Sequence, residues 1–305
     1  MNYLVGFGYS LAWALVKKLP DNLTKKLFLK FAEIAYEKDV QGVQQLRSNL
    51  SFMLDLKTDS LELENLVKEG MKTYFRYWQE LFRLPVWTKN YVNQNIRIIG
   101  LQYLQDTFQA KKPFITAMPH MGNWDAAGFW YTHNFGELTT VAERLKPESL
   151  FKKFVKFRNA FGAEVIPTEG ETDIFMQLIR RAKEGRMIAL VADRDITKNG
   201  IEISYAKSKT TFPVGPAAIA TILNGSIVPM SSFYDEKNIL TLEFFPPLTP
   251  DQNLSKEENI KSLTQKLADI FEREIKNHPK DWHMLQKVWK DVTPLKRLNN
   301  QLVNK

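Results

Sequence analysis

Apolar and polar residues follow two different patterns along the chain. In the first third, apolar side chains recur every three or four residues, as in residues 61–71, which is the period of an amphipathic helix. The helical pattern is broken near Pro20, Pro85 and Gly100, residue types that end or separate helices. We therefore expect residues 1–105 to form a helical N-terminal portion.

The remainder, residues 106–305, mixes short apolar runs with helical patterns. Strands are predicted at residues 114–118, 138–142, 164–166, 187–192, 227–233 and 239–245. Helices are predicted at residues 123–131, 149–161, 174–184, 215–223 and 255–276. Such alternation is typical of an α/β fold with a largely parallel central sheet flanked by helices. Because no repeat, low-complexity tract or Gly/Ser linker interrupts the pattern, we expect residues 1–305 to form a single domain.

The N-terminal end carries an apolar stretch, residues 3–16, followed by Lys17 and Lys18. The stretch is shorter than the roughly 20 residues that a membrane-spanning helix needs. It also lacks the basic start and the small-residue cleavage site of a secretory signal. Two interpretations fit: a helix in the membrane interface whose lysines reach anionic lipids, or a helix of the core.

The amino-acid composition limits the classes of binding partner and the catalytic mechanisms to be considered. The 42 Lys and Arg outnumber the 34 Asp and Glu, and the formal net charge is +8. This balance favours anionic lipid headgroups, nucleotide phosphates or nucleic acid as partners, without choosing among them. The chain has no cysteine, which excludes a disulfide, a cysteine metal site and an acyl-cysteine intermediate. An enzyme of this composition must use another nucleophile or transfer its group directly.

The sharpest candidate for chemistry is residues 119–125 (Pro-His-Met-Gly-Asn-Trp-Asp), which follow the predicted strand 114–118. Ligands of parallel α/β sheets bind just beyond the carboxyl ends of the strands. Asp125 could accept from one imidazole nitrogen of His120 and leave the other nitrogen as a base for a hydroxyl proton. Spacing alone leaves a plainer alternative, in which His120 caps the helix and Asp125 faces solvent near its N-terminus.

Charged residues also follow the next predicted strand. Glu143 and Arg144 come directly after residues 138–142, and Arg158 lies in the following helix among several lysines. In such positions they would bind substrate hydroxyls or the phosphates of a substrate. The alternative is a set of solvated charges of little energetic consequence.

Asp193, Arg194 and Asp195 follow the predicted strand 187–192. Asp-x-Asp spacing is also what a metal-dependent glycosyltransferase uses to hold a divalent ion. Without a metal, Arg194 or its neighbours would bind an anionic group of a substrate. Glu202 is a further carboxylate that could approach His120, although no pattern in the intervening loop fixes its path.

Several common catalytic signatures are absent from the sequence. It contains no Gly-x-Ser-x-Gly, no phosphate loop, no Gly-x-Gly-x-x-Gly and no His-Glu-x-x-His. Their absence removes the common hydrolase, nucleotide triphosphatase, dehydrogenase and zinc-protease interpretations.

The pattern His-x-x-x-x-Asp after a strand resembles the signature of the glycerolipid acyltransferase superfamily. Further runs resemble the branch of that superfamily that acylates lipid A precursors and phosphatidylinositol mannosides. They are residues 76–85 (Arg-Tyr-Trp-Gln-Glu-Leu-Phe-Arg-Leu-Pro), 142–144 (Ala-Glu-Arg), 192–195 (Ala-Asp-Arg-Asp) and 281–286 (Asp-Trp-His-Met-Leu-Gln). The last run resembles the phosphatidylinositol mannoside acyltransferases more than the lipid A enzymes. The runs are spread over nearly the whole chain, in the order of the family.

The resemblance implies an enzyme that transfers a fatty acyl chain from acyl-CoA to a mannose hydroxyl of a phosphatidylinositol mannoside. In this interpretation His120 is the general base and Asp125 assists it. Substrate binding is expected at Glu143, Arg144, Arg158, Asp193, Arg194 and Glu202. We expect no metal and no cofactor, since acyl-CoA is a co-substrate.

The implied partners are acyl-CoA, an anionic glycolipid acceptor and the membrane surface, and not nucleic acid. The implied location is the cytoplasmic side of the cell membrane, as a peripheral protein. Three alternatives stay open: a lipid A precursor acyltransferase, a metal-dependent glycosyltransferase, and a non-catalytic lipid- or nucleic-acid-binding protein.

Overall fold

The computed structural model of the protein describes residues 16–144, 147–169, 173–196 and 199–297. Its helices are α2 (Asp21–Glu37), α3 (Gln41–Leu54), α4 (Leu61–Arg83), η1 (Leu84–Val86), α5 (Lys89–Asn95), α6 (Leu101–Gln109), α7 (Trp124–Asn134), α8 (Glu148–Ala160), α9 (Ile174–Lys183), α10 (Gly215–Leu223), α11 (Lys256–Asn277) and η2 (Pro279–Asp281). Its strands are β1 (Ile96–Ile99), β2 (Phe114–Met118), β3 (Leu138–Ala142), β4 (Ala163–Pro167), β5 (Met187–Val191), β6 (Ile201–Tyr205), β7 (Ser208–Phe212), β8 (Ser226–Tyr234) and β9 (Leu240–Phe244).

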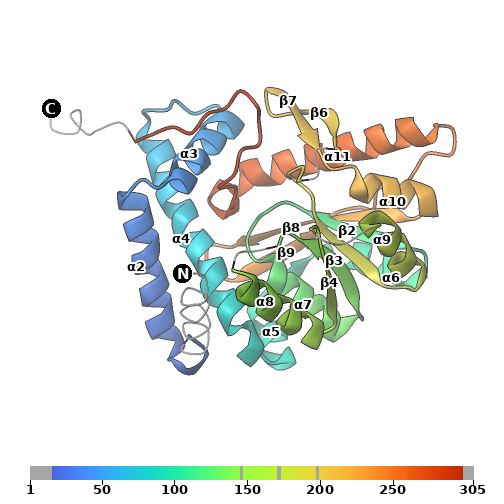
Figure 1. Ribbon diagram of the computed structural model, residues 1–305, viewed down its shortest axis with the longest axis horizontal. Helices are drawn as coiled ribbons and strands as arrows, with labels where there is room; N and C mark the ends of the chain where they lie inside the picture. The colour runs from blue at the N-terminus through green and yellow to red at the C-terminus, as the bar shows by residue number, and fades with distance from the viewer. Residues whose placement is uncertain (1–15, 145–146, 170–172, 197–198, 298–305) are drawn as a thin grey trace.

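The centre of the molecule is a seven-stranded sheet in the order β1-β9-β8-β2-β5-β3-β4. All neighbours pair in parallel except β8 and β9, which form an antiparallel pair. Helices cover both faces of this sheet (Figure 1). The predicted α/β class with a largely parallel sheet is therefore confirmed.

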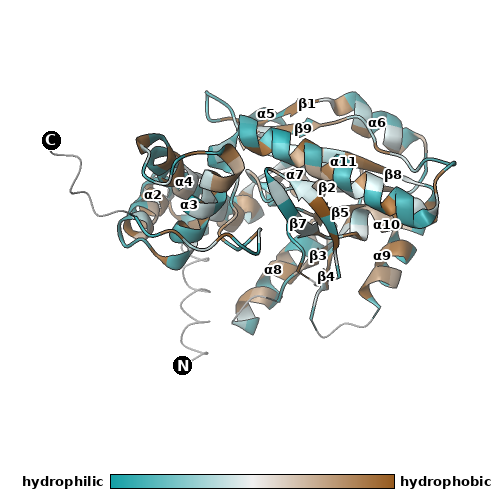
Figure 2. Ribbon diagram, turned by 90° about the horizontal axis from the view of Figure 1, so that it is seen from above, coloured by the Kyte–Doolittle hydropathy of each residue, from teal (hydrophilic) through white to brown (hydrophobic). Residues whose placement is uncertain are grey.

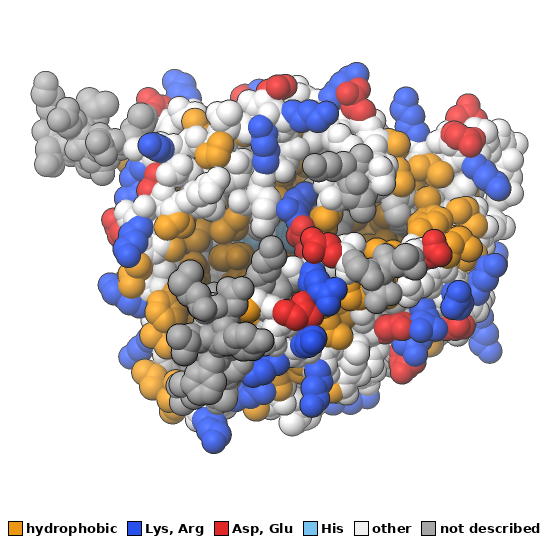
Figure 3. Space-filling view, viewed as in Figure 1, with side chains coloured by type: hydrophobic (Ala, Val, Ile, Leu, Met, Phe, Trp, Pro, Cys, Tyr) orange, Lys and Arg blue, Asp and Glu red, His pale blue; other side chains and the backbone are white. Residues whose placement is uncertain are grey.

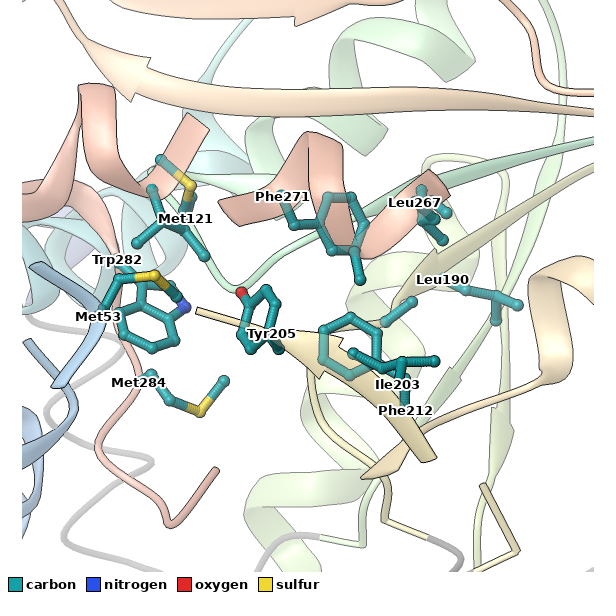
Figure 4. Close-up of a cluster of buried hydrophobic side chains, with 14 of the residues drawn as sticks. Met53, Met121, Leu190, Ile203, Tyr205, Phe212, Leu267, Phe271, Trp282 and Met284 are labelled. Atoms are coloured by element: carbon teal, nitrogen blue, oxygen red, sulfur yellow. The ribbon is translucent and has the colours of Figure 1, made fainter. Parts of the chain in front are cut away.

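Alternating side chains of the strands build a core on each face. In β2, Ile115 and Ala117 pack into the core beneath α9, α10 and α11, while Phe114 and Met118 pack toward α6 and α7. Figure 4 shows part of the first core, where Phe212 of β7 packs against Tyr205 of β6 with ring centroids 4.8 Å apart. Polar residues predominate along the outer length of α11 in Figure 2, as expected for an amphipathic helix that covers a sheet.

The N-terminal helices α2, α3 and α4 pack together beside the sheet (Figure 1). After α11 the chain returns across α3 as a segment that we call the C-terminal strap, residues 281–297. The Asn49 amide donates to the backbone oxygens of Met284 and Gln286, each at 2.8 Å. The Ser48 hydroxyl donates to the oxygen of Thr293 at 2.7 Å. The N-terminal helices thus hold the strap in place.

Two predicted elements need correction. The portion 1–105, expected to be helical, contains strand β1, which pairs with β9 at the sheet edge. The stretch between Asp195 and α10, left without a predicted element, forms an antiparallel hairpin of β6 and β7 that packs on α11. In both places the strands are partly exposed along their length, so they contain no continuous apolar run of the kind that marks a buried strand.

Within the described residues, the structure contains no helix that is both long and apolar enough to cross a bilayer. The predicted interfacial helix falls mostly on residues 1–15, which lie outside the described residues. It stays a prediction.

Candidate active site

The candidate residues gather at the carboxyl ends of three neighbouring strands. His120 follows β2, Asp193 follows β5 and Glu143 follows β3, and β5 lies between the other two strands. The strand order therefore brings residues that are far apart in sequence to one edge of the sheet, where parallel α/β sheets bind ligands.

His120 is paired with Asp193. The imidazole Nδ1 lies 2.5 Å from Asp193 Oδ1, and the backbone N–H of His120 donates to Oδ2 at 3.0 Å. The indole N–H of Trp282 donates to the same Oδ2 at 3.0 Å. A carboxylate at Nδ1 fixes the tautomer that protonates this nitrogen and leaves Nε2 as the basic one. His120 also lines the cavity described below.

Asp193 is fully buried. Burial alone would raise its pKa, but attraction to His120 and the hydrogen bonds from His120 and Trp282 outweigh burial, so the pKa lies below its usual value. The carboxylate is thus charged near neutral pH and can stabilise an imidazolium at His120.

Asp125 does not contact His120 as the sequence predicted. Its carboxylate instead accepts two hydrogen bonds from Arg158, from Nε at 2.7 Å and Nη2 at 2.8 Å, and one from the Tyr77 hydroxyl at 2.8 Å. The reason is the position of Asp125 in the first turn of α7, which directs it toward α4 and α8. Burial would lower the pKa of Arg158, but the Asp125 carboxylate reverses this and raises it.

The run 76–85 in α4 and η1 supports the turn that carries His120. Glu80 accepts from the Asn123 amide at 2.8 Å and from the Tyr234 hydroxyl at 2.6 Å. Asn123 in turn caps α7, because its side chain accepts from the N–H of Ala126 at 2.9 Å. Gly122 has a φ of 55°, and a Cβ there would lie 2.4 Å from the Ser232 oxygen. Only glycine fits this turn.

A cavity of about 260 Å³ opens beside His120 and runs between the sheet and helices α7 and α8. His120, Asp125, Glu143, Arg158 and Arg194 contribute its polar walls. Most other wall residues are apolar, among them Met118, Tyr131, Leu138, Met187, Val191 and Met230. The site therefore places a histidine that is paired with a buried carboxylate beside a space that suits a hydrocarbon chain.

Arg194 is ion-paired with Glu143 at the cavity. Its Nε is buried and lacks a hydrogen-bond partner among the described residues. A buried donor of this kind is costly unless a ligand satisfies it. In the space-filling view, acidic and basic side chains lie next to one another near the middle of the face (Figure 3).

Two other predicted binding residues lie outside this cavity. Arg144 pairs with Glu148 at 2.8 Å and lines an adjacent groove along α8, together with Lys152 and Lys156. Glu202 is on β6, is exposed and pairs with Lys209 at 2.8 Å. It is not among the cavity walls, so the structure does not bring it to His120.

The two carboxylates of the Asp-x-Asp run, those of Asp193 and Asp195, have different partners. Asp193 accepts from His120 and Trp282, whereas Asp195 accepts from the N–H of Gly200 at 2.9 Å. In the described ranges, no group of three or more His, Cys, Asp or Glu side chains is placed to hold a metal ion.

The sequence did not predict the contacts of three further residues of the site. Tyr77 binds Asp125, Trp282 binds Asp193, and His283 lines the cavity with its ring buried. Burial, and to a smaller extent the nearby His120, lower the pKa of His283 to about 3. One signal was available, because a buried Trp or Tyr needs a partner for its N–H or O–H.

The sequence comparisons agree with this geometry. A family model described as bacterial lipid A biosynthesis acyltransferase matches residues 1–291. The phosphatidylinositol mannoside acyltransferase of Mycolicibacterium smegmatis is 35% identical over 283 residues, covering 92% of this chain and 90% of that protein. The protein of the same name from Mycobacterium tuberculosis (strain ATCC 25618 / H37Rv) is 35% identical over 286 residues, covering 93% of this chain and 88% of that protein.

Proposed function

Because the chain belongs to the bacterial lipid A biosynthesis acyltransferase family, we propose that it transfers a fatty acyl chain from acyl-CoA to a mannose hydroxyl of a phosphatidylinositol mannoside. That the chain is an acyltransferase follows from the family and from its relatives. The choice of acceptor rests on what those relatives are named to acylate. One observation supports this chemistry: a histidine that is paired with a buried carboxylate lines a largely apolar cavity.

The proposed reaction needs a base and a fixed geometry, because a thioester is already activated. Nε2 of His120 takes the proton of the acceptor hydroxyl as its oxygen bonds to the thioester carbonyl carbon. The carbon–sulfur bond then breaks, and the imidazolium returns the proton to the leaving thiolate. Asp193 holds the imidazole in the active tautomer and stabilises its positive charge, as the aspartate does in a serine-protease triad.

The acyl chain is proposed to lie in the cavity between the sheet and α7. Burial of a methylene group contributes about 0.8 kcal/mol, and the apolar walls provide that burial next to His120. Arg194 lines the same space. It is suited to bind a substrate oxygen, while the Glu143 carboxylate keeps the guanidinium in place.

Anionic parts of the substrates are proposed to lie in the neighbouring groove along α8. Lys152 and Lys156 are one helical turn apart and exposed. The groove adjoins the cavity, because Glu143 and Thr168 line the cavity and the next residues, Arg144 and Pro167, line the groove. Phosphates of acyl-CoA or of the glycolipid headgroup fit this charge.

Contact with a membrane surface is proposed for the outer side of α2. Leu23, Leu27, Phe31 and Ile34 lie along one side of this helix, and each is between 39% and 50% exposed. Figure 3 shows apolar side chains together with Lys and Arg over this part of the molecule. Such a surface suits an anionic bilayer. Phe31→Glu should weaken binding to anionic vesicles, as should high salt; unchanged binding would contradict the proposal.

The test of function is mass spectrometry of phosphatidylinositol mannosides incubated with palmitoyl-CoA and the protein. The wild type should add one acyl chain, and His120→Ala should be slower by about 10²- to 10⁴-fold. His278→Ala is the matched control, because His278 stacks on Phe233 and does not line the cavity. A His120→Ala protein with wild-type rate would contradict the assignment.

The same assay separates the alternative functions. Acylation of a lipid A precursor alone would keep the chemistry and change the acceptor. No metal is proposed for the reaction, so activity should survive excess EDTA. Loss with EDTA and recovery with manganese, together with transfer of a labelled sugar, would favour a glycosyltransferase.

A further inference from the structure

The Asp193 carboxylate, which pairs with His120, also accepts a hydrogen bond from the C-terminal strap. Trp282 is fully buried, and its indole N–H donates to Asp193 Oδ2 at 3.0 Å. Figure 4 shows its ring between Met53 and Met284. The indole therefore cannot turn away without disturbing the core, and its N–H stays directed at the carboxylate.

The strap is also joined to the turn that carries His120. The N–H of His283 donates to the His120 oxygen at 2.7 Å, and the N–H of Gly122 donates to the Asp281 oxygen at 2.9 Å. Met121 and Trp282 form an antiparallel bridge between these two bonds. The backbone hydrogen bonds fix the distance between the strap and the turn, and Trp282 spans the gap to Asp193.

We infer that Trp282 is a positioning residue of the acyl-transfer site, which holds the Asp193 carboxylate in line with His120 and limits its basicity. The inference rests on the proposed role of His120 as base. An N–H donor stabilises the negative charge of a carboxylate. Without this donor Asp193 would attract the His120 proton more strongly, and the imidazole would stay protonated to higher pH. Trp282 thereby sets the pH at which the base becomes available.

One ionisable group of the strap titrates near neutral pH: burial raises the pKa of Asp281, next to Trp282, to about 7, and its carboxylate accepts from the N–H of Tyr234. The other ionisable groups around Asp193 do not. Burial lowers the pKa of His283 to about 3 and raises that of Tyr205 well above its usual value. Arg194 is ion-paired with Glu143, and Asp125 is ion-paired with Arg158. Asp281→Asn is therefore measured alongside, and it should leave the midpoint of the ascending limb of the pH–rate profile in place, so that a shift reports a change at His120 and Asp193.

The test compares Trp282→Phe with Trp289→Phe in full pH–rate profiles of acyl transfer. Trp289 is the matched control, because it is equally buried in the strap but donates to the Tyr205 oxygen at 3.2 Å. Trp282→Phe should move the midpoint of the ascending limb up by about 0.5 to 1 pH unit, since one hydrogen bond to a charged group is lost. The rate at high pH should stay within about threefold of the wild type, whereas Trp289→Phe should leave the midpoint unchanged.

An unchanged midpoint in Trp282→Phe, or an equal shift in Trp289→Phe, would overturn the inference. Should Trp282→Phe fail to fold, the ¹⁵N-indole spectrum of the folded wild type gives a second test. The Trp282 N–H resonance should move in Asp193→Asn while that of Trp289 stays in place, and a Trp282 resonance that did not move would also overturn it. A wild type with no acyl transfer would contradict the proposed function instead.

Discussion

Asp193 and Asp125 are both buried carboxylates of the candidate site, yet they accept hydrogen bonds from different kinds of group. Asp193, at the end of β5, accepts from a histidine, from a backbone N–H and from a neutral indole. Asp125, in the first turn of α7, accepts from a guanidinium and a phenol. Among the described residues, Asp193 has no cationic arginine or lysine as its partner, so its negative charge can stabilise a proton on His120. The negative charge of Asp125 is neutralised by Arg158.

Distance along the chain therefore does not indicate which carboxylate contacts His120. Asp125 is five residues from His120, whereas Asp193 is 73 residues away. The nearer residue belongs to a helix that leads away from the histidine, and the distant one ends the neighbouring strand. We therefore assign Asp125 a positioning role toward Arg158 and Asp193 the direct role toward His120, and the variants below test that division.

Asp193→Asn should cause the larger loss. An amide cannot stabilise the imidazolium, and it favours the wrong tautomer of His120, an effect of about 10⁴-fold in the serine-protease case. We expect a fall in kcat of about 10²- to 10⁴-fold with the fold retained, checked by circular dichroism and by initial rates of acyl transfer. A fall of less than about threefold would contradict the direct role.

Asp125→Asn should lower the rate less and the stability more. The change leaves the Arg158 cation buried without its counter-ion, which costs about 3 to 5 kcal/mol in free energy of unfolding. We expect the rate to fall about tenfold, a loss of one well-placed interaction. Urea unfolding measures the stability and initial rates measure the activity.

The matched control for Asp125→Asn is Glu164→Gln. Glu164 also accepts two hydrogen bonds from an arginine, Arg181, each at 2.7 Å, but this pair is partly exposed. Its loss should cost less than about 1 kcal/mol. Equal destabilisation by the two variants would show that burial of the Asp125 pair is unimportant.

Gly128→Leu should change chain-length preference with a small effect on the best rate. Gly128 is on α7 and lines the cavity, and a Cβ there would lie an ordinary 3.6 Å from Leu138. A larger side chain would fill the apolar space, so shorter acyl-CoA donors should be favoured over palmitoyl-CoA. Competition between donors of different length measures this ratio, and an unchanged preference would place the acyl chain elsewhere.

His283→Gln should change how the stability of the protein depends on pH. Burial lowers the pKa of His283 to about 3, so between pH 6.5 and 3 the unfolded chain binds a proton that the folded chain does not. The wild type should therefore lose stability as pH falls, by about 2 kcal/mol from pH 7 to pH 5 on account of this residue. Urea unfolding at both pH values should show that the variant lacks this part of the loss; an identical pH dependence would mean that His283 is not buried and neutral.

The fold was largely predictable from the sequence because buried strands leave strong apolar runs. The predicted strands 114–118 and 138–142 coincide with β2 and β3, and the family resemblance is confirmed by the match over residues 1–291. Short strands at the edges, such as β1, left no comparable signal.

The sequence indicated which residues belong to the site, but it did not indicate which of them contact one another. His120, Asp193, Arg194, Glu143 and Arg158 were all expected near the substrate, and all line or adjoin the cavity. Which acid meets His120 depends on the strand order β2-β5-β3, and the part of Trp282 depends on how the strap crosses α3. Neither is visible in local periodicity, because both are set by packing between distant segments.

The pH–rate profiles of Asp193→Asn and Asp125→Asn distinguish which of the two carboxylates acts on His120. The loss of a carboxylate beside an imidazole destabilises the imidazolium. Asp193→Asn should therefore shift the midpoint of the ascending limb to lower pH by about one unit or more, since one unit corresponds to 1.36 kcal/mol of lost interaction. Asp125→Asn should leave that midpoint in place while lowering the rate at every pH. A shift in Asp125→Asn together with an unchanged midpoint in Asp193→Asn would contradict the account.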